Sequence, residues 1–315
     1  MRLIHVETKR LKEFVGRSPP YAILSHTWSD SEVTYDDMLT GNGTKKLGWR
    51  KIEETCRQAR EDGLQYAWVD TCCINKESSS ELSESINSMF RWYREAAICY
   101  AFLQDARRTA STGQDVLELW PNFQRARWFR RGWTLQELLA PAGEFRFYGE
   151  DWQLIGTREE LAIAISQATD IDRDAIYGRA SAGYIRHASI ARKMSWASNR
   201  ETTREEDIAY SLLGLFDVNM PLLYGEGGSR AFERLQEEII KRGTDHSFLV
   251  WGAALDARKA MSNNNNIDFL ARHPKDFSGC GPIMKSGEQV APFALNNLGL
   301  QMRLPVYRVS KWKAD

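Results

Sequence analysis

The sequence predicts an α/β fold in which a mainly parallel sheet is flanked by helices. Short apolar runs of strand length alternate four times with helical patterns in the first half of the chain. Such alternation is typical of parallel strands joined by crossover helices. The pattern becomes helical from about residue 157 and β-rich after residue 245. This change predicts an added helical layer and then a β-rich C-terminal extension.

The first two strands of the expected sheet flank one helix. The apolar run "YAILS", residues 21–25, predicts the first strand, and "QYAWVD", residues 65–70, predicts the second. Between them, residues 47–63 have helical character and end at Gly63, a residue suited to the left-handed turn after a helix. The segment therefore has the order strand, helix, strand.

Two further units continue this order. The helical pattern over residues 81–96 is amphipathic, with apolar residues three and four apart, and "AICYAFL", residues 97–103, follows as a third strand. The apolar positions of that helix are Leu82, Ile86, Met89, Phe90 and Tyr93. A helix around residues 128–139, stopped by Pro141, precedes a fourth strand, "EFRFYG".

The second half of the chain is expected to be helical up to residue 245. Its helical segments are "REELAIAISQAT", "YIRHASIARKMSWAS", "REEDIAYSLLGLF" and "SRAFERLQEEIIKR". Strand-like runs return as "HSFLVWG" and "LGLQMRLPVYRV", with a loop at residues 263–266. We predict one domain over residues 1–245, with an α/β core at about 20–156 and a helical part at about 157–245. The β-rich extension would cover residues 246–315.

Composition narrows the classes of function. Lys plus Arg number 42, as do Asp plus Glu, so the net charge is 0 and no overall field draws the chain to nucleic acid. Five cysteines without a C-x-x-C pair indicate reduced thiols and argue against a zinc site. No stretch resembles a signal peptide or a membrane span. We expect a cytoplasmic protein without a metal, and a longer parent protein.

Polar and aromatic side chains follow the first two predicted strands. Ser25, His26 and Trp28 lie at the end of the first, and Asp70 lies at the end of the second. The carboxyl ends of parallel strands are where such sheets gather their ligand groups. Taken singly, these residues have ordinary interpretations: a turn-forming serine, a hydrogen-bonded loop histidine and a capping aspartate.

The predicted helix at residues 128–139 carries a second polar group. At 100° per residue its leucines share one face, whereas Arg130, Trp133 and Glu137 share the opposite face. An acid beside an aromatic and a base is less expected of a purely solvated face. From geometry alone, a solvated or salt-bridged Glu137 is still the ordinary interpretation.

Other chemistries have weaker support. A serine hydrolase would need the G-x-S-x-G elbow, which is absent. "GNGTKK" lacks the spacing of a phosphate loop, whereas "YGEGGSRAFERL" places glycines before a helix and is a better anion candidate. A nucleophile at Cys72 or Cys73 has no identifiable base.

Four stretches together resemble the fungal heterokaryon-incompatibility (HET) domain. They are "PPYAILSHTWSDSEVTYDDM", "YAWVDTCCINKESSSELSESINSMFRWYREAAICYAFLQD", "RWFRRGWTLQELLAP" and "TTREEDIAYSLLGLFDVNMPLLYGEG", and they span roughly residues 20 to 228. The resemblance implies an effector of the programmed cell death that follows fusion of genetically different hyphae. The segment after about Asp245 is similar to the β-rich extension of some family members.

HET domains are in turn distantly similar to Toll/interleukin-1 receptor (TIR) domains, many of which cleave NAD. This likeness implies a TIR-like, flavodoxin-like sheet. "GWTLQEL" resembles the TIR stretch W-C-x-x-E-L, with Thr134 in place of cysteine, and this match implies that Glu137 is the catalytic acid. "YAILSH" and "AWVDTCCI" resemble the first two TIR strands.

The resemblance gives the other site residues their expected roles. NAD would be a substrate, with no cofactor. Trp133 would wall the pocket, Asp70 would order the following loop, and Arg130 or Arg131 would meet the pyrophosphate. Ser25, His26 and Trp28 would line the nicotinamide ribose. Whether Arg204 and Asp207 reach the site is left open.

Two classes of function are therefore expected to compete. The first is an NAD glycohydrolase that binds NAD or a related nucleotide and self-associates. The second is a death-signalling module without catalysis, which assembles through its surfaces and with receptor-like regions of the parent protein. An enzyme acting on another nucleotide or on nucleic acid is less favoured. Glu137 in a cleft near Ser25 favours the enzyme, and Glu137 on the exterior favours the module.

Overall fold

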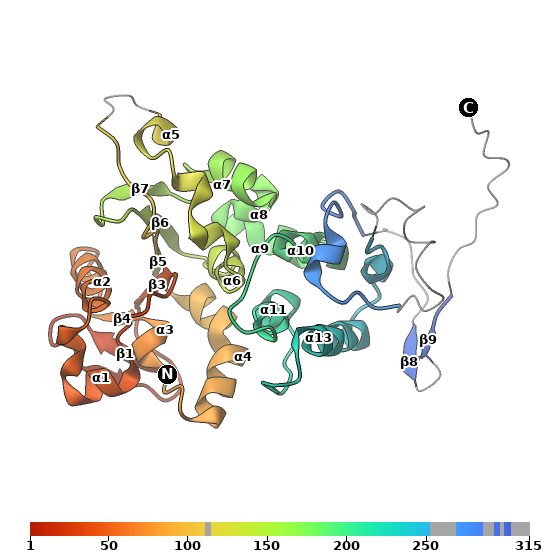
Figure 1. The fold of residues 1–315 in the computed structure, drawn as a ribbon, viewed down its shortest axis with the longest axis horizontal. Helices are drawn as coiled ribbons and strands as arrows, with labels where there is room; N and C mark the ends of the chain where they lie inside the picture. The colour runs from red at the N-terminus through yellow and green to blue at the C-terminus, as the bar shows by residue number, and fades with distance from the viewer. Residues whose placement is uncertain (111–114, 253–268, 286–292, 297–298, 304–315) are drawn as a thin grey trace.

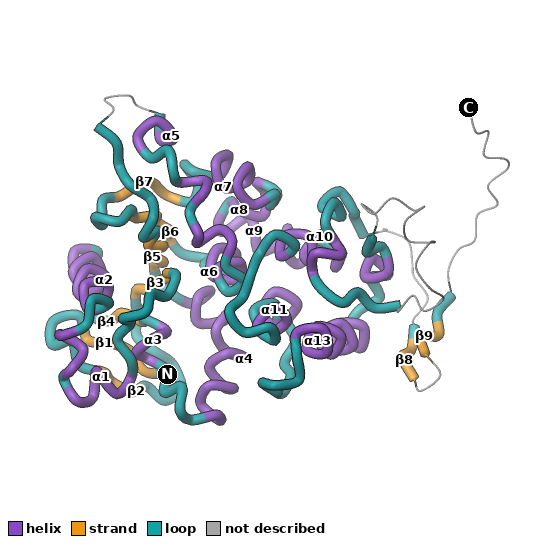
Figure 2. The backbone as a smooth tube through the Cα atoms, in the orientation of Figure 1, coloured by secondary structure: helices purple, strands orange, loops and turns teal. Residues whose placement is uncertain are grey.

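The N-terminal half of the chain forms a seven-stranded mixed sheet with the order β2-β1-β4-β3-β5-β6-β7 (Figure 1). The computed structural model describes residues 1–110, 115–252, 269–285, 293–296 and 299–303. Figure 2 shows the large sheet within the N-terminal half of the chain and mainly helices in the part that follows.

The four predicted parallel strands form the middle of the sheet. They are β3 (Ala22–His26), β4 (Tyr66–Trp68), β5 (Ile98–Phe102) and β6 (Glu144–Tyr148), paired in the order β4-β3-β5-β6. Every residue of β3, β4 and β5 is buried, as expected for parallel strands covered on both faces. The chain adds β4 on one side of β3 and then β5 on the other, so the order of addition reverses at β3.

The edges of the sheet are antiparallel. β1 (Arg2–His5) pairs with β2 (Leu11–Glu13) and β4, and β7 (Leu154–Thr157) pairs with β6. The expectation of a mainly parallel sheet therefore holds for the middle, whereas the complete sheet is mixed. The sequence did not predict these three antiparallel strands because they have only three or four residues each.

The crossover helices cover both faces of the sheet. α2 (Trp49–Glu61) joins β3 to β4, and α4 (Ser79–Glu95) joins β4 to β5; Figure 1 shows them on opposite sides of the strands. This arrangement follows from right-handed crossovers that run in opposite directions along the sheet, from β3 to β4 and then from β4 back past β3 to β5. Gly63 directly follows the C-cap of α2 with a φ of +76°, as its expected place predicts. Ser78 caps α4 by accepting from the amide of Glu81 at 3.4 Å.

Shorter helices fill the loops of this half. They are α1 (Tyr35–Thr40), η1 (Asn42–Lys45), α3 (Asp70–Cys73), α5 (Val116–Leu119), η2 (Phe123–Arg125), η3 (Arg127–Arg130) and α6 (Thr134–Leu139). The predicted helix at 128–139 is therefore two separate pieces, η3 and α6, with Arg131, Gly132 and Trp133 between them.

The second half is helical up to residue 242, as its pattern predicts. Its helices are α7 (Ala162–Thr169), α8 (Arg173–Ile176), α9 (Gly178–His187), α10 (Ile190–Ala197), α11 (Asp207–Tyr210), α12 (Leu213–Phe216) and α13 (Gly228–Arg242). α12 packs on α4, which joins the helical layer to the sheet.

The C-terminal part differs from its prediction. The run "HSFLVWG" was expected as a strand, but residues His246–Leu249 form the 3-10 helix η4. Asp245 explains the difference, because its carboxylate accepts from the amide of Ser247 at 2.9 Å and caps a helical turn. The other elements are η5 (Pro274–Phe277) and the hairpin of β8 (Ala294–Asn296) and β9 (Gly299–Gln301). The loop expected at 263–266, and residues 304–309 of the last run, lie outside the described residues.

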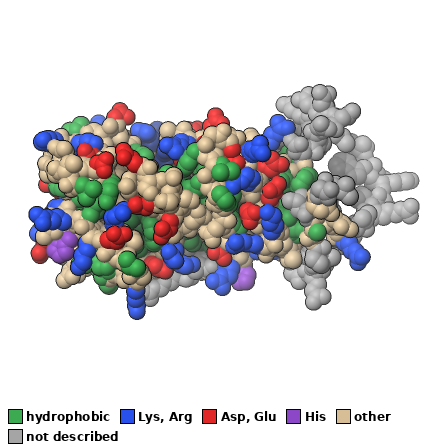
Figure 3. Space-filling view, turned by 90° about the horizontal axis from the view of Figure 1, so that it is seen from below, with side chains coloured by type: hydrophobic (Ala, Val, Ile, Leu, Met, Phe, Trp, Pro, Cys, Tyr) green, Lys and Arg blue, Asp and Glu red, His purple; other side chains and the backbone are tan. Residues whose placement is uncertain are grey.

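The surface carries charges of both signs. On the face shown in Figure 3, acidic and basic side chains are interspersed, in keeping with the net charge of 0. Within the described part of the chain, no helix combines the length and the apolar character that crossing a membrane requires.

The contact between α12 and α4 gives a test of the packing. A Cβ added to Gly214 would lie 2.1 Å from Cβ of Phe90. We expect Gly214→Ala to lower the free energy of unfolding by about 1–3 kcal/mol, because the packed helices must separate. Urea denaturation measures this change.

Gly183 provides the matched control, because an added Cβ there meets nothing within 4 Å. Gly183→Ala lies within helix α9 and should stabilise the protein by about 0.5–1 kcal/mol. Equal stabilities of the two variants would contradict the described packing of α12 on α4.

Candidate functional site

The break between η3 and α6 is held by side-chain hydrogen bonds. The Thr134 hydroxyl lies 2.5 Å from the carbonyl oxygen of Trp128 and 2.8 Å from that of Arg131. The Arg200 guanidinium donates to Thr134 Oγ1 and to the carbonyl of Arg131, both at 2.9 Å. These bonds turn the chain so that α6 begins at Thr134 and enters the core.

The expected two-faced helix is therefore wrong at α6. All six of its residues are buried, including Gln136 and Glu137, so no face of α6 is solvated. The prediction assumed one continuous helix from residue 128. Because the chain breaks between η3 and α6, the side chains of α6 no longer keep the predicted angles relative to those of η3. Glu137 has 7% of its surface exposed and is not a surface acid.

Glu137 meets Ser25 across the sheet edge. The Ser25 hydroxyl, fully buried near the carboxyl end of β3, donates to Oε2 of Glu137. The indole nitrogen of Trp128 donates to Ser25 Oγ at 2.8 Å. Residues more than 100 positions apart in sequence thus form one hydrogen-bonded chain, from Trp128 through Ser25 to Glu137.

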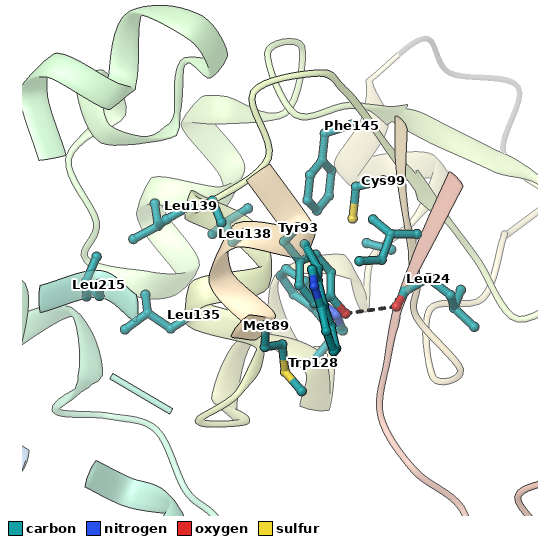
Figure 4. Packing of buried hydrophobic residues seen from close by; sticks show 14 of the residues in the cluster. Leu24, Met89, Tyr93, Cys99, Trp128, Leu135, Leu138, Leu139, Phe145 and Leu215 are labelled. Atoms are coloured by element: carbon teal, nitrogen blue, oxygen red, sulfur yellow. Dashed lines mark hydrogen bonds between the residues drawn. The ribbon is translucent and has the colours of Figure 1, made fainter. Parts of the chain in front are cut away.

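Aromatic and apolar side chains enclose this chain. Figure 4 shows Tyr93 of α4 beside Trp128, with its hydroxyl donating to the carbonyl oxygen of Leu24 at 2.9 Å. Phe145 and Cys99 lie in the same cluster. Trp128 is fully buried and packs edge-on against the ring of Phe145. The carboxyl group of Glu137 therefore sits in a dry surrounding.

Burial has a direct effect on the proton of Glu137. Burial, reinforced by the negative charge of Asp70, raises the pKa of Glu137 to about 8. The hydrogen bond from Ser25, the nearby Tyr93 hydroxyl and the positive charge of Arg200 oppose this shift without cancelling it. At neutral pH the carboxyl group is mainly protonated.

Arg200 is a buried cation whose charge acts on Glu137. It is 2% exposed, its Nη2 has no hydrogen-bond partner among the described residues, and burial lowers its pKa to about 9. Its attraction to Glu137 works against that lowering. The sequence analysis missed Arg200, Trp128 and Tyr93 because the tertiary fold alone brings them to Glu137. The quoted family stretches include Trp128 and Tyr93 but give neither of them a role.

A second polar group surrounds Asp70, as the strand ends predicted. Its carboxylate lies 3.0 Å from Nε2 of His26 and accepts from the indole nitrogen of Trp28 at 2.9 Å. Lys76 lies 3.8 Å from the same carboxylate and 3.4 Å from the centre of the Trp28 ring. Burial alone would raise the pKa of Asp70, but Lys76, His26 and Trp28 outweigh it and lower this pKa to about 2.

The tautomer of His26 follows from its other neighbour. The Lys51 ammonium donates to the carbonyl of Thr27 at 3.1 Å and to Glu32, and lies 3.2 Å from Nδ1 of His26. An ammonium can only donate, so Nδ1 accepts and Nε2 carries the proton that His26 gives to Asp70. A chain of hydrogen bonds thus runs from Glu32 through the buried Lys51 and His26 to Asp70.

The predicted arginines do not join either group. Arg130 is exposed, and Arg131 donates to Thr203 Oγ1 at 2.9 Å. Within the described residues, no hydrogen bond or ion pair connects these two guanidinium groups to Ser25, Glu137 or Asp70. The role of Arg130 or Arg131 at the pyrophosphate therefore remains a prediction, and the hydrogen bond to Thr203 directs Arg131 toward the helical layer.

Trp133, Arg204 and Asp207 form a neighbouring cluster. Burial raises the pKa of Asp207, and hydrogen bonds from the Trp133 indole and the Tyr224 hydroxyl oppose this, the latter at 2.9 Å. Arg204 stacks on the Tyr224 ring at 4.3 Å from its centre. Burial is the main cause of the lowered pKa of Lys76, and the positive charge of Arg204 contributes to it. Arg204 therefore lies near the group around Asp70.

An open cavity adjoins the Asp70 side of the site. Its volume is about 430 Å³, and its lining includes Ser29, which follows β3, Phe102 at the carboxyl end of β5, and Lys51 in the first turn of α2. Trp152 forms another wall. Neither this cavity nor a larger one described below is lined by Ser25 or Glu137. Within the described residues, no group of His, Cys, Asp and Glu side chains is arranged to hold a metal ion.

Comparisons with known proteins place these residues in a family context. Residues 21–119 match the family model described as heterokaryon incompatibility protein (HET), and residues 230–286 match a domain of unknown function (DUF8212). Ser25, His26, Trp28 and Asp70 fall inside the first match, whereas Glu137 lies beyond it. The limits predicted for the two domains remain predictions.

One relative extends the likeness further. The chain is 48% identical over 229 residues to the vegetative incompatibility protein HET-E-1 of Podospora anserina. The aligned region is 72% of this chain, and the chain spans 16% of the length of that protein. No solved structure matches the chain.

The raised pKa of Glu137 gives a test by pH. In an unfolded chain Glu137 would have the ordinary pKa of 4.5, so between pH 4.5 and about 8 the folded protein holds this proton more tightly. Stability from this source is therefore fully present below pH 4.5 and is lost as pH rises toward 8. We expect a loss of up to about 1.4 kcal/mol per pH unit.

Glu137→Gln should remove this slope, since an amide does not titrate. Urea denaturation of both proteins between pH 5 and pH 8.5 measures the difference. Glu53→Gln, a change at an exposed position of α2, is the control and should keep the slope of the unmodified protein. Identical slopes in all three proteins would show that Glu137 titrates normally.

Proposed function

The chain carries a heterokaryon-incompatibility (HET) domain, and from that premise we propose that it is a cell-death effector that hydrolyses NAD to nicotinamide and ADP-ribose. Glu137 is the catalytic residue in this proposal, and it acts as a carboxylate. The observation that carries it is the buried contact between Ser25, near the carboxyl end of the central strand, and Glu137. A surface acid on an assembly module would need no such environment.

The topology supports a ligand site at this edge. In chain order the four parallel strands are arranged 2-1-3-4, which is the start of the flavodoxin-like order. Sheets of that kind bind ligands outside the carboxyl ends of the strands where the order reverses, here between β3 and β5. This order also supports the proposed likeness to TIR domains. The 430 Å³ cavity opens at the same ends.

The proposed reaction breaks the bond between C1′ of the ribose and the nicotinamide nitrogen. Nicotinamide leaves with the bonding electron pair and becomes neutral, while positive charge develops on the sugar as an oxocarbenium ion. Water adds to C1′ and releases a proton to solvent. The Glu137 carboxylate, facing the sugar, would stabilise the developing charge, and a dry surrounding strengthens that interaction.

In this proposal Glu137 is protonated in the free protein and becomes ionised when the cationic substrate binds. The nicotinamide ring of NAD carries a positive charge, and its approach favours the ionised carboxylate. Ser25 is a positioning residue, because it donates to Glu137 and Trp128 fixes its hydroxyl. The aromatic Trp28, half exposed beside Lys76, is proposed to form the outer rim for the nucleotide.

Access to Glu137 connects the proposal to self-association. Glu137 is only 7% exposed and lines neither cavity, so NAD must reach it through a rearrangement of the strand ends. We propose that association of copies stabilises the open arrangement. Activity per molecule should then rise with protein concentration.

Nicotinamide release from NAD tests the catalytic role. We expect release by the unmodified protein, measured by chromatography from dilute to concentrated samples, and a loss of about 100-fold or more in Glu137→Gln. Glu53→Gln should behave as the unmodified protein. Lethality of the expressed protein without release at any concentration would refute the enzyme and favour the non-catalytic module.

The pH profile tests which form of Glu137 acts. Because the carboxylate is the proposed active form, kcat/KM should rise with pH and level off above about 8. Ser25→Ala removes a hydrogen bond that lowers the pKa of Glu137, so its profile should shift to higher pH. A profile that falls between pH 6 and 8 would contradict the assignment.

A further inference from the structure

A second cavity, larger than the first, lies away from the Ser25 and Glu137 contact. Its volume is about 980 Å³, and its walls come from α4, α9, α10, α12 and α13, with the end of α6. Residues 243–247 and 283–285 close another side. The cavity therefore lies where the helical layer and the C-terminal part meet α4, the helix that covers one face of the sheet.

The lining of this cavity is strongly basic. Six basic side chains face two acidic ones, Asp217 and Asp245, in a protein whose net charge is 0. The basic residues are Arg91, Arg94, Arg186, Lys193, Arg242 and Lys285. Within the described residues no salt bridge joins any of the six to a carboxylate. Like charges gathered without ion-pair partners raise the local positive potential.

Lys193 is the buried member of this set. It is 9% exposed, and its ammonium group donates to the carbonyl of Leu215 at 3.3 Å. This is its one hydrogen bond within the described part of the chain, which leaves two of its three protons for other acceptors. Burial and the charge of Lys285 lower the pKa of Lys193 to about 8. A buried cation with free donors is costly unless an anion meets it.

Two further buried polar atoms of the cavity lining have no hydrogen-bond partner among the described residues. They are Oδ1 of Asn87, whose amide nitrogen donates to the carbonyl of Ser83 at 2.9 Å, and Nε2 of His246. Buried polar groups are normally satisfied, so such atoms in one cavity indicate a polar ligand. His246 can donate from Nε2, and Asn87 can accept.

The lining also contains apolar side chains, which come from α4, α6, α9, α12 and α13. They are Phe90, Leu139, Ile185, Phe216 and Ile239. A pocket with apolar side chains and a few convergent charges is typical of sites for small organic anions, and its volume is in the range of such sites. Inorganic phosphate alone would leave these apolar side chains without a partner.

We propose that this cavity binds a phosphorylated organic small molecule, with its phosphates on Lys193 and the surrounding arginines and its organic body against the apolar side chains of the lining. This site is separate from the proposed NAD site, and its test does not depend on NAD hydrolysis.

Calorimetric titration of the full chain tests the proposal with three probes: ADP, pyrophosphate and adenosine. ADP should bind most tightly, since it has both the phosphate charges and the organic nucleoside. Added salt should weaken the binding of ADP. Adenosine should bind at least about tenfold more weakly than ADP, because it lacks the charged hydrogen bonds. Adenosine binding as tightly as ADP, or no binding of ADP at millimolar concentration, would overturn the proposal.

Variants locate the binding. Lys193→Met should weaken ADP binding by about tenfold or more, and Arg242→Ala should weaken it severalfold. Lys241→Ala is the matched control, because Lys241 neighbours Arg242 on α13 but does not line the cavity. If Lys193→Met fails to fold, the double variant Arg94→Ala with Arg242→Ala replaces it.

A further variant distinguishes binding in the cavity from binding at the Glu137 site. Glu137→Gln should bind ADP as the unmodified protein does. ADP binding that survives the cavity variants but is lost in Glu137→Gln would place the ligand at the other site and refute this proposal.

Discussion

The hydrogen bond between Ser25 and Glu137 is the contact on which the site depends. It ties the central strand of the sheet to α6, and Trp128 completes it from the other side. A buried carboxyl group is costly unless it is hydrogen-bonded or keeps its proton, and Glu137 does both. The break before α6, held by Thr134 and Arg200, is what directs this acid into the core instead of solvent.

The two carboxyl groups of the site have opposite environments. The dry cluster around Trp128 and Tyr93 raises the pKa of Glu137 to about 8, whereas Lys76, His26 and Trp28 lower that of Asp70 to about 2. Groups whose pKa values are pushed apart in one site commonly have separate chemical roles. Here the charged Asp70 binds His26, Trp28 and Lys76. Glu137 is the carboxyl group that changes its protonation near neutral pH.

The sequence predicted the middle of the sheet because each of its strands is an apolar run bounded by polar residues. It also placed Ser25, His26, Trp28 and Asp70 at strand ends, where the structure has them. The helix at residues 128–139 was wrong in its continuity, since periodicity cannot show a break that a distant arginine holds. For the same reason Arg200 had no signal, and its contact with Thr134 exists only after the helical layer packs on the sheet.

Carbon-13 NMR of the Glu137 carboxyl, titrated from pH 5 to pH 10, tests the account most directly. The titration would be run on the free protein and on its complex with an NAD analogue whose ribose ring oxygen is replaced by carbon, which resists cleavage. We expect a midpoint near 8 in the free protein and a lower one in the complex, because the cationic nicotinamide favours the carboxylate. A midpoint near the ordinary 4.5, unchanged by the analogue, would contradict both the buried environment and the catalytic role of Glu137.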